Sequence, residues 1–321
     1  MLLAALPDGY AARVPTIGDS ETVTDLIAEC RLAVGDRSGM TVEELLGDWH
    51  DITLSEEAVA VEAPDGRLAA YADVLNRSYV SVSVYGYVHP EHRGRGLGTF
   101  IVGWGEEWVR GRLHLASGGA RVVVQHYVHT ADEPAACLME RTDYTPVRGY
   151  YRMSVELDGT PPQPEWPDGI RVRTFVPGRD EKVVYDSVED AFCDVWGRPR
   201  GTFERFLGLT RVEGFDHDLW FVAESRGGIS GVCLCKVVGG SGEVDVVGVR
   251  SPWRGMGLGL ALLRHALGEF YRRGVQEVGL SVDAASVTGA PLLYGKAGMR
   301  AAESYILYQK ELRPGRDPDA T

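Results

Sequence analysis

Two stretches of this chain repeat one another, and they decide the fold. The first is Val88-His89-Pro90-Glu91-His92-Arg93-Gly94-Arg95-Gly96-Leu97-Gly98, and the second is Val249-Arg250-Ser251-Pro252-Trp253-Arg254-Gly255-Met256-Gly257-Leu258-Gly259. They are separated by half of the 321-residue chain. Such self-similarity indicates a duplicated unit, and half of this chain is an ordinary length for one domain. The sequence therefore predicts two domains of the same fold.

A proline-rich segment between the two stretches marks the predicted domain boundary. Within residues 157–169 the prolines are Pro161, Pro162, Pro164 and Pro167. Prolines at this density favour an extended connector over a packed element. We therefore expect an N-terminal domain over residues 1–156, a C-terminal domain over residues 170–312 and a flexible tail over residues 313–321.

The residues around each stretch follow the same order of predicted elements. A strand, a helix, a strand hairpin and a longer strand precede the glycine-rich loop, and an amphipathic helix follows it. The helical spacing of apolar residues is seen at Leu97, Ile101, Trp104 and Trp108, and again at Leu258, Leu262, Ala266 and Phe270. The pattern predicts an α+β fold that is built twice.

The composition limits the classes of function. The formal net charge is −13, which argues against binding to nucleic-acid phosphates or anionic membranes. Five cysteines without a Cys-x-x-Cys motif support neither a disulfide framework nor a zinc site, and the histidines show no metal-binding spacing. Because no signal-peptide pattern is present either, we expect a cytoplasmic protein with no metal, no nucleic-acid partner and no membrane segment.

The repeated Arg-Gly-x-Gly-Leu-Gly pattern predicts a phosphate-binding turn. Glycines let successive backbone N–H groups turn inward, and the start of the following helix adds partial positive charge. The Walker pattern is absent because no Gly-Lys-Ser/Thr follows, and hairpins before the loops fit a dinucleotide fold poorly. Glycines that only make a tight turn are the alternative interpretation, which two copies in matching contexts disfavour.

With these residues in view, the chain resembles tandem members of the GNAT family of acyl-coenzyme A-dependent N-acetyltransferases, of the actinobacterial mycothiol synthase type. The family pattern Arg/Gln-x-x-Gly-x-Gly/Ala matches Arg93–Gly98 and Arg254–Gly259, and Thr288–Met299 looks like the family's segment Ala-x-x-Leu-Tyr-x-x-x-Gly-Phe. The resemblance implies a mixed, splayed sheet flanked by helices in each half, and acetyl-CoA as the acetyl donor.

The resemblance also implies which residues bind the coenzyme. Pantetheine would pair with the end of the second-half strand, and the pyrophosphate would lie on the turn that follows. The implied residues are Val247, Gly248, Val249, Arg254, Gly255, Met256, Gly257, Leu258 and Gly259 in the second half, and Val88, Arg93, Gly94, Arg95, Gly96, Leu97 and Gly98 in the first.

Acetyl transfer to an amine needs a base, an oxyanion donor and an acid for the departing thiolate. The resemblance assigns the acid to Tyr294 and the oxyanion donor to the backbone of the Val249 strand. Glu243 or Asp245, two residues apart on one strand face, is the expected base. A buried core tyrosine and solvent-facing acids on an edge are the alternatives.

The first half departs from this pattern. Aligning the corresponding segments puts Met139 where Tyr294 stands, and counting back from the loop puts Val82 where Glu243 stands. A thioether donates no proton and valine accepts none. We therefore expect a catalytically degenerate N-terminal domain.

The acceptor side is indicated by Asp194, Trp196 and Lys236, an acid, an aromatic residue and a lysine that suit a small cationic or partly apolar amine. Asp194 and Trp196 can equally be helix surface and cap. The sequence predicts an N-acetyltransferase that acts on a small-molecule primary amine, as a monomer or homodimer. The rival hypothesis is a non-catalytic acyl-CoA-binding sensor or interaction protein, which would need neither Tyr294 nor Glu243.

Overall fold

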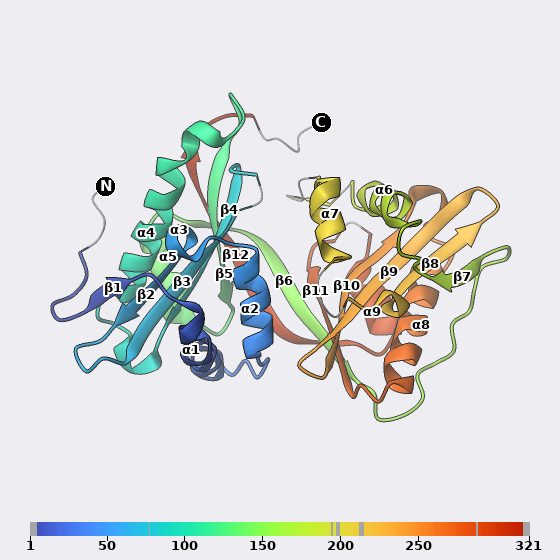
Figure 1. Ribbon diagram of the computed structural model, residues 1–321, viewed down its shortest axis with the longest axis horizontal. Helices are drawn as coiled ribbons and strands as arrows, with labels where there is room; N and C mark the ends of the chain where they lie inside the picture. The colour runs from blue at the N-terminus through green and yellow to red at the C-terminus, as the bar shows by residue number, and fades with distance from the viewer. Residues whose placement is uncertain are drawn as a thin grey trace. The chain divides into compact units, whose positions relative to one another are not determined.

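The computed structural model describes most of the chain. The described residues are 5–76, 78–193, 195–196, 200–211, 215–286 and 288–316. They form two compact units, of which the first is built from two separate pieces of sequence and the second from one continuous piece. The first unit comprises residues 1–149 and 304–321, and the second comprises residues 150–303. Figure 1 shows the elements of each unit.

Each unit carries a six-stranded mixed sheet. In the first unit the strand order is β1-β2-β3-β4-β5-β12, and in the second it is β7-β8-β9-β10-β11-β6. The strands of the first are β1 (Ala11–Arg13), β2 (Ala58–Glu62), β3 (Leu68–Asn76), β4 (Ser81–Val88), β5 (Val122–His129) and β12 (Arg300–Arg313). Those of the second are β6 (Thr145–Glu156), β7 (Arg171–Thr174), β8 (Trp220–Ser225), β9 (Gly228–Val238), β10 (Ser241–Val249) and β11 (Glu277–Asp283).

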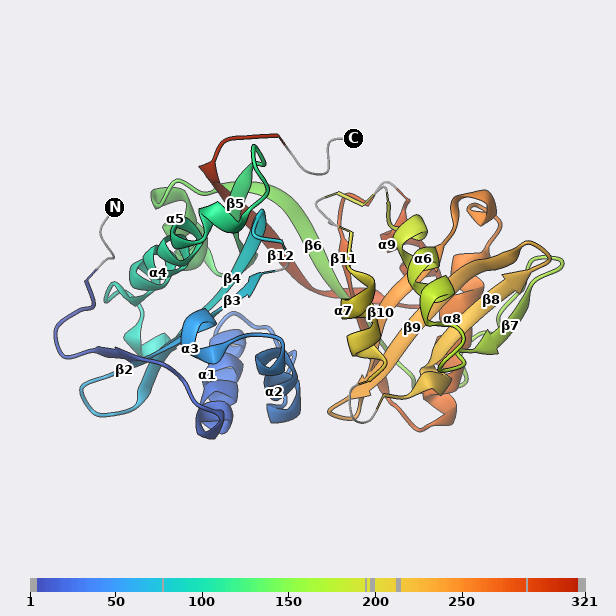
Figure 2. The ribbon, with the colours of Figure 1, turned by 45° about the horizontal axis from the view of Figure 1, so that its top comes forward.

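Helices cover both faces of each sheet (Figures 1 and 2). The first unit contains α1 (Ser20–Leu32), α2 (Val42–His50), α3 (Leu54–Glu57), α4 (Leu97–Gly111) and α5 (Glu133–Arg141). The second contains α6 (Glu181–Ala191), α7 (Phe203–Leu209), α8 (Leu258–Arg272) and α9 (Ala290–Lys296). In the second unit α6 and α7 pack on one face around Phe206 and Trp220, and α8 packs on the other around Leu262 and Phe270. The expected α+β fold with two mixed sheets is confirmed.

The last strand of each sequence half enters the sheet of the other unit. Residues Tyr150–Glu156 of β6 pair antiparallel with β11, and residues Tyr305–Arg313 of β12 pair antiparallel with β5. Sequence analysis placed residues 1–156 in one domain and 170–312 in the other. The compact units instead exchange the strands that end these two ranges.

Each sheet diverges between its two central parallel strands. The β10–β11 ladder consists of the pairs Gly242–Val278 and Glu243–Gly279, although β10 continues to Val249. The β4–β5 ladder is also short, with three pairs from Ser81 to Ser83. This divergence is the splay that the family resemblance implied.

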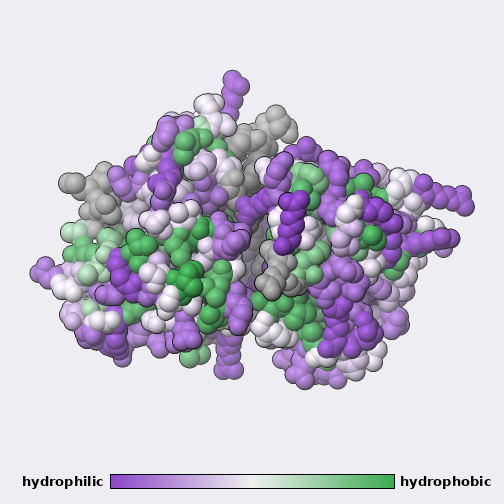
Figure 3. Space-filling view, viewed as in Figure 1, coloured by the Kyte–Doolittle hydropathy of each residue, from purple (hydrophilic) through white to green (hydrophobic). Residues whose placement is uncertain are grey.

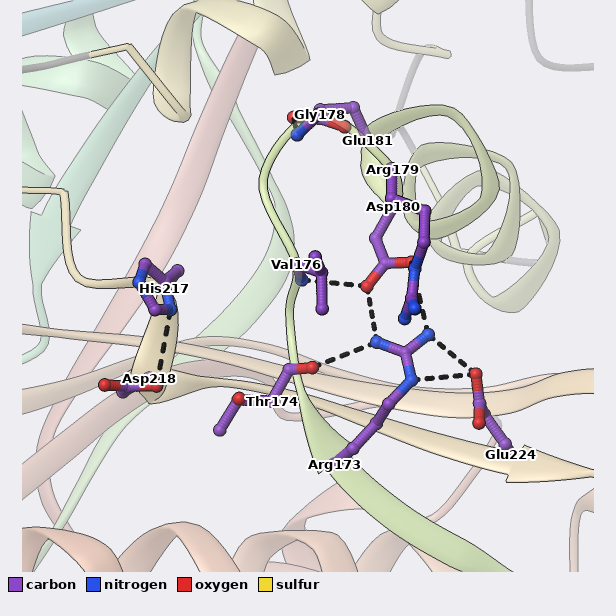
Figure 4. Close-up of polar contacts among 10 residues, drawn as sticks. All are labelled: Arg173, Thr174, Val176, Gly178, Arg179, Asp180, Glu181, His217, Asp218 and Glu224. Atoms are coloured by element: carbon purple, nitrogen blue, oxygen red, sulfur yellow. Dashed lines mark hydrogen bonds and ion pairs between the residues drawn. The ribbon is translucent and has the colours of Figure 1, made fainter.

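A repeated ion-pair cluster ties strand β1 to the start of α1 in the first unit and strand β7 to the start of α6 in the second. Arg13 bonds Asp19 at 2.6 Å and Glu62 at 2.6 Å. Arg173 in the same way bonds Asp180 and, at 2.6 Å, Glu224 (Figure 4). Because the cluster recurs at the same place in both units, its role is structural.

A depression of about 700 Å³ lies beside the second cluster. The arginines that line it already contact carboxylates, since Arg173 bonds Asp180 and Arg250 bonds Asp190 at 2.6 Å. Its charge is therefore largely balanced within the protein.

The surface is mixed in character. Figure 3 shows hydrophilic and apolar residues interspersed over the visible face. Within the described ranges, no helix has both the length and the apolar composition needed to cross a membrane.

The exchanged strand β12 supplies a cation to a buried carboxylate of the first unit. The Lys310 ammonium lies 2.8 Å from one oxygen of Glu106, whose side chain is 0% exposed, and Arg110 lies 2.6 Å from the other. We predict that Lys310→Met lowers the free energy of unfolding by about 3 kcal/mol, because a buried charge loses a partner. Urea denaturation measures this loss. The control Arg67→Met breaks an exposed ion pair with Asp65 and should cost much less, because water screens that pair. Equal losses in the two variants would contradict the prediction.

Candidate active site

The two glycine-rich stretches adopt the same backbone conformation. Gly94 and Gly96 have φ of 74° and 90°, and Gly255 and Gly257 have φ of 76° and 83°. These angles lie in the left-handed region, which residues with a Cβ atom adopt only at a cost. Each turn leads directly into a 15-residue helix, α4 or α8. Backbone N–H groups at such a helix start can hold an anion.

The third glycine of each stretch allows a second helix to approach closely. A Cβ atom on Gly98 would lie 2.8 Å from Leu138 of α5, and one on Gly259 would lie 2.9 Å from Leu293 of α9. The two contacts are equivalent, and the next residues along these helices are Met139 and Tyr294. The structure thus gives Met139 and Tyr294 corresponding positions in their units.

The open edge of β10 offers a backbone donor beside the turn. The N–H of Arg250 donates to Ser230 O at 3.0 Å, toward β9. Because N–H groups alternate in direction along a strand, that of Val249 points to the side where β11 has diverged. Arg254 Nε donates to Val249 O at 3.2 Å, and its Nη2 donates to Ala191 O at 2.9 Å. The Arg254 side chain thus links the turn to the ends of β10 and α6.

Tyr294 is half-buried and packs into the core on the α8 side of the sheet. Burial raises the pKa of its phenol to about 12. The hydroxyl is therefore protonated at neutral pH and can donate a proton. Its position fits the acid role that the family resemblance implied.

Glu243 points to the opposite face of the same sheet. A Cβ atom on Gly242 would lie 2.9 Å from Phe270 of α8, and Val244 is part of the core on that side. Since strand side chains alternate, Glu243 between them faces away from α8. The two candidate groups lie on either side of the sheet where β10 and β11 part.

Arg152 of β6 contacts the Glu243 carboxylate through both oxygens. Its Nη1 donates to Oε1 at 2.5 Å and its Nη2 donates to Oε2 at 2.5 Å. Burial raises the pKa of Glu243, and the Arg152 guanidinium acts in the opposite direction. Sequence reasoning missed Arg152, because it lies far away in the chain and in the range assigned to the other domain.

Asp245 occupies a β-bulge, where the β9–β10 register shifts between Val244 and Val246. Its carboxylate lies 3.2 Å from Lys236 Nζ, and both side chains are about half exposed. Glu243 also pairs directly opposite Lys236 in the ladder. The structure therefore brings Glu243, Asp245 and Lys236 together. Of the other two acceptor-side candidates, Trp196 is 40% exposed, and Asp194 lies outside the described residues.

The bulge changes which first-unit residue corresponds to Glu243. On β9, the partner of Glu243 is Lys236, which lies five positions after Gly231. On β3, the residue five positions after Ala70 is Leu75, and its partner is Ser83. Gly231 and Ala70 both pair with the last residue of the adjacent strand. The ladder counterpart of Glu243 is thus Ser83 rather than Val82.

The N-terminal segment of the chain contacts the turn of the first unit. Arg95 donates to the hydroxyl of Tyr10 at 2.9 Å, and that hydroxyl also bonds His92 Nδ1 at 2.8 Å. A Cβ atom on Gly96 would lie 3.8 Å from Pro7, whereas no described atom lies within 4 Å of a Cβ position on Gly94, Gly255 or Gly257. The two turns share a backbone conformation and exposed glycines, and they differ in this contact with the N-terminal segment.

The comparisons with known proteins agree with this geometry. The acetyltransferase (GNAT) family model matches residues 184–299. The chain is 35% identical to a mycothiol acetyltransferase of Thermobispora bispora, over 70% of this chain and 74% of that one. A mycothiol acetyltransferase of Streptomyces avermitilis is 30% identical over 96% of this chain and 94% of its own.

This chain belongs to the GNAT family of acetyltransferases. A solved GCN5-related N-acetyltransferase from Sphaerobacter thermophilus is 52% identical, with a TM-score of 0.90, over 99% of this chain and all of that one. A tandem GNAT protein from the clavulanic acid biosynthesis pathway shares the fold, with a TM-score of 0.69 at 16% identity over 96% of this chain and all of that one. The protein is an acyl-CoA-dependent N-acetyltransferase with tandem GNAT architecture.

GNAT acetyltransferases use acetyl-CoA, and the residues of the second unit fit it. The turn at Gly255 and Gly257 has open space where side chains would stand, and the N–H of Val249 faces the open edge. A pyrophosphate needs the first feature and an amide-bearing chain such as pantetheine needs the second.

We predict that Gly257→Ala weakens binding of coenzyme A about tenfold, because an alanine at φ +83° costs roughly 1–2 kcal/mol and turns the N–H groups away from the phosphates. Isothermal titration calorimetry with coenzyme A measures the change. Gly96→Ala is the matched variant in the first unit and should change the affinity less, since Pro7 and Tyr10 contact that turn. The reverse ranking of the two variants would contradict the prediction.

The first unit contains a carboxyl group with a shifted pKa, that of Asp73. Trp49 Nε1 donates to the Tyr71 hydroxyl at 2.7 Å, and that hydroxyl donates to Asp73 at 2.9 Å. Burial raises the pKa of Asp73 to about 7, and the charge of Asp48 acts in the same direction. The fold therefore favours the protonated carboxyl. Sequence analysis gave no signal for this group.

Because the folded-state pKa of Asp73 exceeds the unfolded value, its contribution to stability is full below about pH 4 and is lost as the pH rises through about 7. We predict that Asp73→Asn flattens the fall in melting temperature between about pH 5 and about pH 8. Asp65→Asn, at a fully exposed carboxylate, should keep the wild-type slope. An Asp73→Asn slope equal to that of the wild type would refute the assignment.

Proposed function

We propose that this protein transfers the acetyl group of acetyl-CoA to the primary amine of a small molecule, and that the chemistry takes place in the second unit. The observation that carries the proposal is that Glu243 and Tyr294 lie on opposite faces of the sheet, where β10 and β11 diverge. A base and an acid on opposite faces let the acceptor and the thioester approach from different sides.

In this proposal Glu243 removes the proton from the ammonium group. An unperturbed alkylammonium has a pKa of about 10.4, so most acceptor molecules arrive protonated at neutral pH. Burial makes the Glu243 carboxylate more basic than an exposed one. Asp245 stands beside it and is bonded to Lys236. We therefore assign Asp245 and Lys236 to binding of the polar acceptor rather than to proton transfer.

Acetyl-CoA supplies the activated thioester. The amine nitrogen forms a bond to the carbonyl carbon, and the Val249 N–H stabilises the charge that develops on the carbonyl oxygen. When the carbon–sulfur bond breaks, the electron pair goes to sulfur, and Tyr294 donates its hydroxyl proton there. The nitrogen gives up its second proton to water as the amide forms, and the Tyr294 phenolate regains a proton from water. The raised pKa of Tyr294 keeps that proton available.

We propose that the first unit is not catalytic. Met139 stands at the position of Tyr294 and is 3% exposed, and Ser83 stands at the ladder position of Glu243. Pro7 and Tyr10 contact its turn, although Gly94, Arg95 and Gly96 are exposed. Binding of coenzyme A at Arg93–Gly98 therefore stays a prediction.

The acceptor is proposed only as a class. The curated relatives are mycothiol acetyltransferases, which makes the unacetylated mycothiol precursor the first acceptor to test. Glucosamine and benzylamine complete a panel of a hydrophilic and an apolar primary amine. Trp196 and Lys236 remain proposed acceptor contacts on the described part of the chain.

We predict that Glu243→Gln and Tyr294→Phe each lower kcat about 10²–10⁴-fold with the best amine of this panel, because each removes one proton-transfer group. Release of free coenzyme A thiol measures kcat. Calorimetry with coenzyme A should give wild-type affinity for both variants, which separates chemistry from binding.

Met139→Leu is the matched control in the first unit and should keep wild-type kcat, since a buried thioether is replaced by a side chain of similar volume. If Met139→Leu abolished thiol release while Tyr294→Phe remained fully active, the assignment of chemistry to the second unit would fail.

A further inference from the structure

Arg152 reaches Glu243 across an intervening strand. It stands on β6 opposite Ser281 of β11, and Glu243 stands on β10 opposite Gly279 of β11. A Cβ atom on Gly279 would lie 2.5 Å from Nη2 of Arg152. The guanidinium therefore lies directly over Gly279, and only a residue without a side chain leaves room for it there.

The charged groups that face Glu243 come from three strands. They are Arg152 from β6, Lys236 from β9 and Asp245 from β10 itself. Lys236 is bonded to Asp245, whereas Arg152 bonds both oxygens of Glu243. The Arg152 and Glu243 side chains are 31% and 20% exposed, so water screens their interaction only partly.

We infer that Arg152 is a positioning residue for the reaction: it holds the Glu243 carboxylate charged and in one orientation where β10 and β11 diverge. The inference rests on the proposed function in that it takes Glu243 as the base. It adds that the second unit's site is completed by a strand from the first half of the sequence.

The geometry explains why an arginine stands here. A planar guanidinium with two parallel N–H groups matches a carboxylate edge to edge and fixes its plane. A lysine ammonium would supply the charge without fixing that plane. The carboxylate thus keeps a defined orientation toward the open edge of β10.

The first test measures the Glu243 carboxyl directly and needs no acceptor. Carbon-13 NMR of protein labelled at glutamate carboxyls, with the signal assigned by its absence in Glu243→Gln, gives its titration. In Arg152→Gln we expect the pKa of Glu243 to rise by about 1–2 units, because the cation that favours the charged form is lost. Arg152→Lys should give an intermediate shift. Arg272→Gln, which removes an arginine bonded to Glu269 at the surface, should give none. An unchanged Glu243 titration in Arg152→Gln would overturn the inference.

The second test follows activity against pH with the best amine of the panel above. A higher pKa of the base moves the acid limb of kcat/KM to higher pH by the same amount, about 1–2 units, so Arg152→Gln should lose about 10–100-fold in kcat/KM on the acid limb and recover this loss at alkaline pH. Affinity for coenzyme A should stay at the wild-type value. Gly279→Ala provides a second variant that displaces the guanidinium while keeping its charge, and it should lower kcat with a smaller shift of the acid limb.

The outcomes separate the two proposals. If Glu243→Gln were fully active, the assignment of the base would fail, whatever the NMR titration of Arg152→Gln shows. If Arg152→Gln lost activity together with coenzyme A affinity, and its residual activity kept the wild-type pH profile, Arg152 would be merely structural and the inference would be overturned.

Discussion

The structure depends on one constraint, which is that neither sheet is complete within its own half of the sequence. β6 ends the first half and pairs with β11, and β12 ends the second half and pairs with β5. Each entering strand also carries a cation to a carboxylate of its host unit. Arg152 meets Glu243 in the second unit, and Lys310 meets Glu106 in the first. Backbone pairing and charge pairing therefore act together, and both require the full chain.

The two units show that the same local backbone geometry can carry different side chains at the candidate site. Both have a turn with two left-handed glycines, a third glycine against a leucine, and a short parallel ladder. These features follow from backbone sterics and recur whether or not chemistry takes place. The side chains placed on them differ: Met139 and Ser83 in one unit, Tyr294 and Glu243 in the other. The contacts of the turn differ too, because Arg95 of the first turn donates to Tyr10.

Much of this could be predicted from the sequence, because the signals are local. The glycine turns, the amphipathic helices and the match of Met139 with Tyr294 each depend on residues within one short stretch. The strand exchange could not be predicted, since β6 and β12 read as ordinary final strands of their own halves. The β-bulge at Asp245 could not be predicted from the sequence either. Counting residues back from the loop aligns Val82 with Glu243. Because the bulge adds one residue to β10, the strand pairing aligns Ser83 with Glu243 instead. Arg152 carried no signal, because its partner is close only after folding.

The exchange has a consequence for how the first half can vary. On the proposed function, the first half needs neither an acid nor a base of its own. It still provides Arg152, and with it the bidentate contact with the Glu243 carboxylate over Gly279. Substitutions near Arg93–Gly98 would then bear mainly on the first unit's own folding, whereas a substitution at Arg152 would bear on the chemistry proposed for the second unit. Of the two exchanged strands, β6 is therefore the one whose charge the proposed reaction requires.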